Sequence, residues 1–345
     1  MRGKIRNRVM FSQGFTLIEL LLAMSLGSLI LLSLTQVVQA SKTAYRLHEG
    51  LARLQESGRL AMEFMTRDIR MSGFSGCASS QFNNIGNQLD GETGDSLMSN
   101  FQGYHLEGVD DYDGSVVRYA DDRPFANRTA HGRPVVGTDV LIVRLPVGQP
   151  LRLLADADHR PGELWVRSVA GEPPVESGDL LLLSDCNRSR VFRASGSHWG
   201  DEETRSVIRY QGDWAARQPV FQQGAEVYRL ETRMYYVRRG TRGTGNSLYL
   251  KQGSEVSPPQ ELLEGVEDLQ IRYGVGERQG RGLALRRFLS ASAVEEQQLW
   301  HAVTGVRLQV SLASLEGRLL SDGSEGDGRL RRDFVTLVTL RNRAL

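Results

Sequence analysis

The sequence predicts an α+β protein, in which a long N-terminal helix spans a membrane, packs on an antiparallel sheet and precedes an elaborated β-rich head. An apolar run, 15–38, is followed directly by an amphipathic run, 39–72, and no later segment is apolar enough to span a membrane. The remaining residues, 73–345, form short strand-like runs bounded by Gly, Pro, Asn or Asp. Turn-forming residues at the ends of short apolar runs are typical of antiparallel strands joined by turns.

Composition narrows the class of function. The formal net charge is +1, without the basic excess of most nucleic-acid-binding proteins, so we expect no nucleic acid as a partner. The six histidines are scattered singly, and no nucleophile-elbow, zinc-protease or phosphate-loop motif occurs. We therefore expect neither an enzyme nor a bound cofactor.

Charge is distributed unevenly around the apolar run. Arg2, Lys4, Arg6 and Arg8 precede it, and no acid occurs before Glu19. This arrangement predicts that the first fourteen residues stay in the cytoplasm and that the following segment crosses the membrane. A helix over 15–38 is about 36 Å long at 1.5 Å per residue, enough to span a bilayer.

Glu19 lies inside the apolar run, where a charge costs on the order of 3 kcal/mol. A plain, uncleaved anchor leaves this carboxylate without a partner. Cleavage between Gly14 and Phe15 would create an amine four residues earlier, at the membrane face. An ordinary secretory signal fits poorly, because the polar step 12–14 comes before the apolar run and 38–40 is a weak cleavage site.

The segment 14–19, Gly-Phe-Thr-Leu-Ile-Glu, resembles the processing site of type IV prepilins and the related pseudopilins. The resemblance implies that residues 1–14 are a leader peptide and that prepilin peptidase cuts between Gly14 and Phe15. It also implies that Phe15 is N-methylated and that Glu19 pairs with a neighbouring subunit's amine during assembly. Such a pair sets the register between subunits, because each charge alone is strongly penalised in hydrocarbon. Many major pilins carry a proline part-way along this helix, whereas the first proline here is Pro124, so the resemblance implies a minor component rather than the repeating fibre subunit.

The second half of the predicted helix, 39–72, is amphipathic. Its apolar residues recur at steps of three and four: Leu47, Leu51, Leu54, Ala61, Phe64, Met65 and Ile69. The short pattern lacks strict heptads, so we expect packing on a sheet rather than a coiled coil. With the membrane half, the helix reaches about 85 Å. Gly50 and Gly58 weaken it locally, and Gly73 ends it.

Strands are expected after a loop-rich segment, 75–135. The clearest runs are 138–146, 162–169, 178–186, 189–195, 225–239 and 246–252. Segment 258–275 predicts a helical turn followed by a strand, and 300–315 and 331–343 predict two long strands paired antiparallel across 316–330. The arginines of the last run, Arg331, Arg332, Arg341 and Arg343, predict the solvent face of an edge strand.

Four further segments, 66–77, 178–195, 262–275 and 337–345, resemble the PilW family of type IV pilus assembly proteins. The resemblance implies a minor pilin that joins other minor pilins and the major pilin, and that helps prime pilus assembly from the inner-membrane machinery. It would sit in the inner membrane with its head in the periplasm before assembly, and at the pilus tip afterwards. A J-type minor pseudopilin of type II secretion stays open as the alternative, because it shares the leader, the helix and a large head.

Two further groups of residues bear on the head. Cys77 and Cys186 are the only cysteines, both on the exported side, and an oxidising compartment favours a disulfide between them. Both lie in segments that carry the PilW resemblance. Two acidic turns carry oxygen ligands that suit calcium: Asp110, Asp111 and Asp113, and Asp322, Glu325 and Asp327. Both turns lack the EF-hand spacing, so we interpret them as solvated loops and expect no bound metal.

Overall fold

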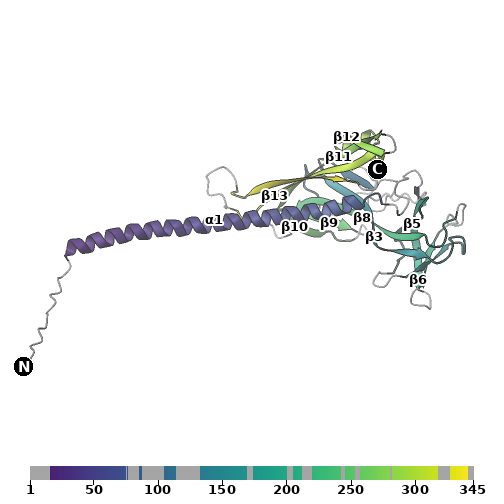
Figure 1. Ribbon diagram of the computed structural model, residues 1–345, viewed down its shortest axis with the longest axis horizontal. Helices are drawn as coiled ribbons and strands as arrows, with labels where there is room; N and C mark the ends of the chain where they lie inside the picture. Colours follow the sequence, from purple (N-terminus) through teal and green to yellow (C-terminus); the bar gives the residue numbers. More distant parts are fainter. Residues whose placement is uncertain are drawn as a thin grey trace, which may run out of the picture.

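A computed structural model describes residues 16–74, 76, 85–87, 105–113, 133–168, 174–199, 205–211, 220–241, 245–252, 257–279, 282–317 and 327–340. One long helix projects from a head built almost entirely of strands (Figure 1). The predicted α+β class, with a long apolar N-terminal helix and an antiparallel, β-rich head, is confirmed.

Helix α1, Leu17–Met71, is continuous through Gly50 and Gly58. Its last turn closes when the Ser72 N–H donates to carbonyls in the preceding turn, and Gly73 then adopts a left-handed φ of 76°. A left-handed residue just after the last turn is a common helix stop, and glycine accepts it without a steric cost. The two internal glycines do not interrupt the helix, because its C-terminal half is fixed by packing on the head.

The head contains fourteen strands and two short helical segments within the described residues. In chain order they are β1 Ile85–Asn87, β2 Leu106–Val109, β3 Val140–Leu153, β4 Glu163–Arg167, β5 Leu180–Ser184, β6 Ser189–Trp199, β7 Arg205–Tyr210, β8 Glu226–Arg239, β9 Asn246–Gln252, β10 Gln260–Glu264, β11 Val266–Gln279, β12 Gly282–Leu289, α2 Ala291–Glu296, η4 Trp300–Ala302, β13 Val303–Ala313 and β14 Arg331–Thr339.

A four-stranded antiparallel sheet has the order β12-β11-β13-β14. The pairing of Val306 with Val338 lies in the β13–β14 ladder, which confirms the expected hairpin of the two long C-terminal strands. Strand β14 is an edge strand, as its arginines predicted. Arg331 and Arg332 are exposed, while Arg341 and Arg343 lie outside the described residues.

The helical turn expected at the start of 258–275 is wrong. That segment is strand β10, which pairs antiparallel with β9, and Gly265 then turns the chain into β11 at a φ of 82°. A Cβ at this glycine would lie 2.6 Å from the Ala313 carbonyl oxygen. The spacing of apolar residues suits a helix locally, but pairing with β9 satisfies the backbone and decides the structure.

The second sheet has ten strands and partly closes on itself. Pairings run from β3 to β8, to β5, β6, β7 and β4, and from β4 back to β3, so six strands form a closed barrel. Inward side chains of these strands make a separate apolar core, in which Leu164, Phe192 and Ile208 are buried. We call this part the distal barrel, because it lies beyond the C-terminal end of α1, away from the N-terminus (Figure 1).

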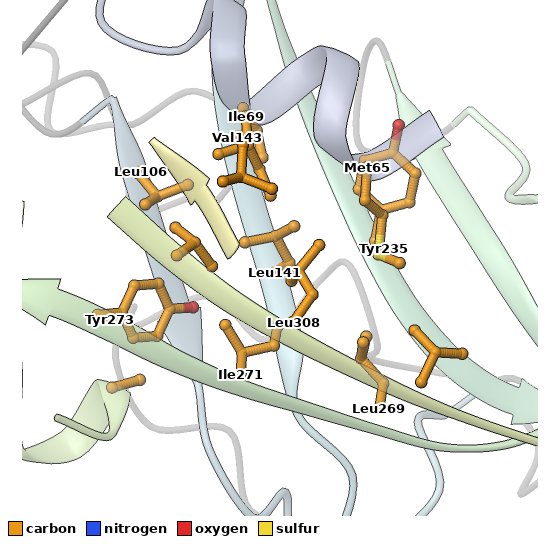
Figure 2. Close-up of a cluster of buried hydrophobic side chains, with 14 of the residues drawn as sticks. Met65, Ile69, Leu106, Leu141, Val143, Tyr235, Leu269, Ile271, Tyr273 and Leu308 are labelled. Atoms are coloured by element: carbon orange, nitrogen blue, oxygen red, sulfur yellow. The ribbon is translucent and has the colours of Figure 1, made fainter. Parts of the chain in front are cut away.

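The main core lies where the two sheets and the end of α1 meet. Figure 2 shows Met65 and Ile69 of the helix together with Leu141 of β3, Tyr235 of β8 and Leu308 of β13. Helix α1 contacts β13, β14, β3 and β10. The amphipathic half of the helix therefore packs on sheets, as its periodicity predicted.

Candidate functional site

The N-terminus of α1 places Glu19 in the first turn of the helix. Thr16 is the N-cap: its hydroxyl oxygen accepts the Glu19 backbone N–H at 3.3 Å. The Glu19 Oε2 accepts the Thr16 backbone N–H and the Thr16 hydroxyl, both at 3.0 Å. This capping box fixes the carboxylate beside the N-terminal pole of the helix, where a negative charge is favoured.

The membrane half of α1 presents large apolar side chains all round. Among the described residues, α1 is the one helix long and apolar enough to cross a membrane. The exposed apolar residues of this half are Leu17, Ile18, Leu20, Leu21, Leu22, Met24, Leu26, Leu29, Ile30, Leu31, Leu32, Leu34, Val37 and Val38. An apolar surface of this size requires a lipid or protein cover.

The hydroxyl groups in this half are satisfied within the helix itself. Ser25 donates to the Leu22 carbonyl at 2.9 Å, and Ser33 donates to the Leu29 carbonyl at 2.9 Å. Ser28 and Thr35 make equivalent bonds one turn back. Polar groups that are paired inside the helix can enter hydrocarbon without the cost of unmade hydrogen bonds.

A buried aspartate joins the other end of α1 to the sheet. Asp68, only 2% exposed, accepts hydrogen bonds from Arg233 Nη1 at 2.9 and 3.0 Å and from the Tyr235 hydroxyl. Burial, and then the neighbouring Asp68 charge, raise the pKa of Tyr235 above its usual range. The tyrosine therefore stays protonated and remains a donor. Loss of either partner would leave a buried charge less satisfied, so this contact fixes how the helix enters the head.

A second buried aspartate joins the two sheets. Asp139 Oδ1 accepts the Asp111 N–H at 2.9 Å, and Oδ2 accepts the Ile271 N–H of β11 at 2.6 Å. Burial raises the pKa of Asp139 to about 6, the two backbone hydrogen bonds oppose the rise, and the charges of Asp110 and Asp111 add to it. Neither aspartate was singled out by the sequence, because nothing local distinguishes a buried acid from a surface one.

The acidic turn at 110–113 has structural partners. Asp110 accepts the Ser292 backbone N–H at 2.7 Å and the Ser292 hydroxyl at 2.9 Å, and so holds the start of α2. Within the described part of the chain, no group of three or more His, Cys, Asp or Glu side chains is arranged to hold a metal ion. Asp322 and Glu325 of the second turn lie outside that part, whereas Asp327 accepts hydrogen bonds from Arg331.

The processing and disulfide predictions depend on Gly14, Phe15 and Cys77, which lie outside the described residues. The cleavage point and the disulfide therefore stay predictions. Cys186 is exposed in the turn between β5 and β6.

Comparisons with known proteins address the two ends of the chain. Residues 10–35 match the model of the prokaryotic N-terminal methylation motif, and residues 234–342 match the model of type IV pilus-assembly protein W. In these two segments the chain is similar to the N-terminus of prepilins and to the PilW family of type IV pilus assembly proteins. No curated protein and no solved structure matches it.

The PilW match can be placed on the fold. It begins within β8 and extends through β14, so it includes Tyr235, which donates to Asp68 of α1, and the whole four-stranded sheet. The methylation-motif match contains Gly14, Phe15, Glu19 and the start of α1. Strands β3 to β7, which with β8 form the distal barrel, lie between the two matched segments.

Proposed function

We propose that this protein is a minor pilin of the type IV pilus, processed by prepilin peptidase between Gly14 and Phe15 and N-methylated at Phe15. Its parts are a leader, 1–14, a helix with a membrane half, 15–38, and an amphipathic half, 39–72, and a periplasmic head, 73–345. It resides in the inner membrane before assembly, helps the inner-membrane machinery to prime the fibre with other minor pilins and the major pilin, and enters the pilus at its tip. This role requires no catalysis.

One observation carries the proposal: an exposed apolar half-helix that begins with a fixed carboxylate. In the capping box, Glu19 Oε2 accepts both bonds from Thr16, so Oε1 remains available for a cation within the described structure. An amine from a neighbouring subunit would complete the neutralisation of Glu19 as the apolar half-helices pack together. In a low-dielectric setting such a pair is strongly favoured over either charge alone.

Substitution of Glu19 separates pairing from capping. Glu19→Gln keeps an oxygen acceptor for Thr16 but removes the charge, whereas Glu19→Ala removes both. We expect both variants to be cleaved normally and to enter pili poorly, measured by immunoblotting of sheared pili and of membranes. Normal incorporation of Glu19→Gln, with loss for Glu19→Ala, would assign Glu19 to helix capping and contradict the pairing role.

A clean deletion tests the function itself. We expect the deletion strain to lose surface pili and to keep type II secretion, with both scored in the same culture and restored by the wild-type gene. Loss of secretion with normal pili would identify a J-type minor pseudopilin instead. In the strain restored with the wild-type gene, a mature protein that retains residues 1–14 in the presence of active peptidase would contradict the processing step.

A further inference from the structure

The outer surface of the distal barrel has two unlike sides. On the side of β5, β6 and β8, Leu182, Val191 and Tyr228 are buried and pack with Phe74, which follows α1. The Phe74 and Tyr228 rings meet edge to face at 5.3 Å. This apolar side attaches the barrel to the rest of the molecule, which leaves the side of β3, β4 and β7 for solvent.

That second side carries a row of arginines across three neighbouring strands. In the antiparallel ladders, Arg152 of β3 lies opposite Arg167 of β4, and Arg167 lies opposite Arg205 of β7. Adjacent strands are about 4.8 Å apart, so three positive charges follow one another at close spacing. Like charges directly opposite in a sheet are destabilising. We call these three residues the arginine row.

Ion pairs within the described structure neutralise this row only in part. Arg167 and Arg205 form no ion pair with any residue that the structure describes, and Arg152 reaches Glu226 at 3.6 Å while its side chain is 68% exposed. The Arg205 guanidinium lies 3.7 Å from the centre of the Trp165 ring, and Arg160 lies 5.6 Å from it. The cation–π contact orients Arg205 without consuming its hydrogen-bond donors.

We propose that the arginine row binds an acidic segment of a partner protein, with carboxylates that reach two or three adjacent guanidinium groups. Planar guanidinium forks match carboxylates in a two-bond geometry and lose little freedom on binding. The same side of the barrel already holds carboxylates against arginines in this chain. Glu163 lies 3.7 Å from Arg209 and 3.6 Å from Arg160, which shows that a carboxylate fits at this surface.

Two other anionic partners fit less well. The apolar first half of α1 lies at the opposite end of the molecule from the barrel (Figure 1), so the lipid headgroups of a membrane around that half would not reach the row. A nucleic acid would gain little from Trp165, because Arg205 and Arg160 lie over the ring that a base would stack on. Glu163 and Glu226 beside the row would repel a continuous phosphate backbone. The proposed binding depends only on the residues of the distal barrel, so it does not depend on whether the protein serves a pilus or a type II secretion system.

The test is a binding measurement on the full chain in a non-ionic detergent, with a fluorescent oligoglutamate peptide as the probe. We expect saturable binding that weakens with added salt and falls roughly tenfold in the Arg167→Gln, Arg205→Gln double variant. The double variant Arg239→Gln, Arg307→Gln is the matched control, because it also removes two positive charges. Both are exposed arginines, on β8 and β13, that likewise form no ion pair with described residues, and we expect the variant to bind like the wild type.

A charge-reversed variant distinguishes loss of the binding charges from loss of the folded structure. Arg167→Glu, Arg205→Glu should lose the oligoglutamate and gain binding to an oligolysine peptide, with an unchanged near-ultraviolet circular dichroism spectrum. Absence of oligoglutamate binding, an equal loss in the Arg239→Gln, Arg307→Gln variant, or tighter binding of a DNA duplex with the same number of charges would each overturn the proposal.

Discussion

At the scale of single residues, three carboxylates hold parts of the described structure together through hydrogen bonds. Glu19 and Thr16 cap α1, Asp68 holds its last turns against β8, and Asp139 joins the two sheets. Asp68 pairs with the guanidinium of Arg233, whereas the described partners of Asp139 are backbone N–H groups alone. Its ionisation therefore carries a desolvation cost that no cation offsets.

This cost predicts a pH dependence of stability. The pKa of Asp139 is about 6 in the folded protein, above the ordinary 3.8, because burial disfavours the charged form. The folded state then binds the proton more tightly than the unfolded state, so the free energy of unfolding should rise as the pH falls from about 7 toward about 4. The full effect is at most about 3 kcal/mol.

Asp139→Asn checks this dependence, because an amide does not titrate. Denaturant unfolding at several pH values should give a flatter slope for the variant than for the wild type across this range. Identical slopes in the two proteins would show that another group is responsible.

At the scale of elements, α1 and the four-stranded sheet fit through one small residue. Gly58 is buried against Phe334 of β14, and a Cβ at Gly58 would come within 2.4 Å of that ring. Glycine costs about 1 kcal/mol relative to alanine inside a helix. This local cost allows the helix to approach β14 closely.

Gly58→Ala should therefore destabilise the protein despite its better helix propensity. In a Phe334→Ala background the obstacle is gone, and the same substitution should stabilise by about 1 kcal/mol. A double-mutant cycle of denaturant unfolding measures both. The same sign for Gly58→Ala in the two backgrounds would refute the proposed fit between the glycine and the ring.

The elements that the sequence predicted well are those with a strong local pattern. The three- and four-residue spacing of Leu54, Ala61 and Met65 predicted the buried side of α1, and the alternation after Arg331 predicted β14. In contrast, β10 was mistaken for a helical turn, and β7, β12 and α2 were not anticipated. Strands β7 and β10 and helix α2 are short, and whether a short segment becomes a strand depends on pairing with another strand, which the pattern of the segment alone does not contain.

One candidate site could be predicted from the sequence, and the other could not. Glu19 could be found from the sequence, since a carboxylate in an apolar run is anomalous by itself. The arginine row could not, because Arg152, Arg167 and Arg205 become neighbours only through strand register. These arginines are far apart in the sequence, so the high local positive charge is evident only once the strands of the barrel are paired.

At the scale of the whole molecule, the barrel is attached near the point where α1 ends. Gly76 lies against Ser184: a Cβ on Gly76 would come within 2.4 Å of the Ser184 hydroxyl oxygen. Gly76, which directly precedes Cys77 in the sequence, therefore lies close to the end of β5, two residues before Cys186. This proximity supports the proposed disulfide between Cys77 and Cys186.

The disulfide predicts a measurable loss on removal. The Cys77→Ser, Cys186→Ser variant should be less stable by about 4 kcal/mol, because the bond closes a long loop. Intact mass under non-reducing conditions, after thiol labelling of the wild type, should detect no free thiol. Two labelled cysteines in the oxidised wild type would contradict the bond.

The arrangement of α1 also determines how the molecule would respond to a mechanical load. The buried contacts of the helix, from Leu54 to Ile69, lie in a line parallel to its axis, and the Asp68–Arg233 ion pair stands near the inner end of that line. A pull on the membrane half would act along this line, so the contacts would be sheared together rather than peeled apart one by one. A helix joined lengthwise to its head should therefore resist a pull along its axis better than a pull across it.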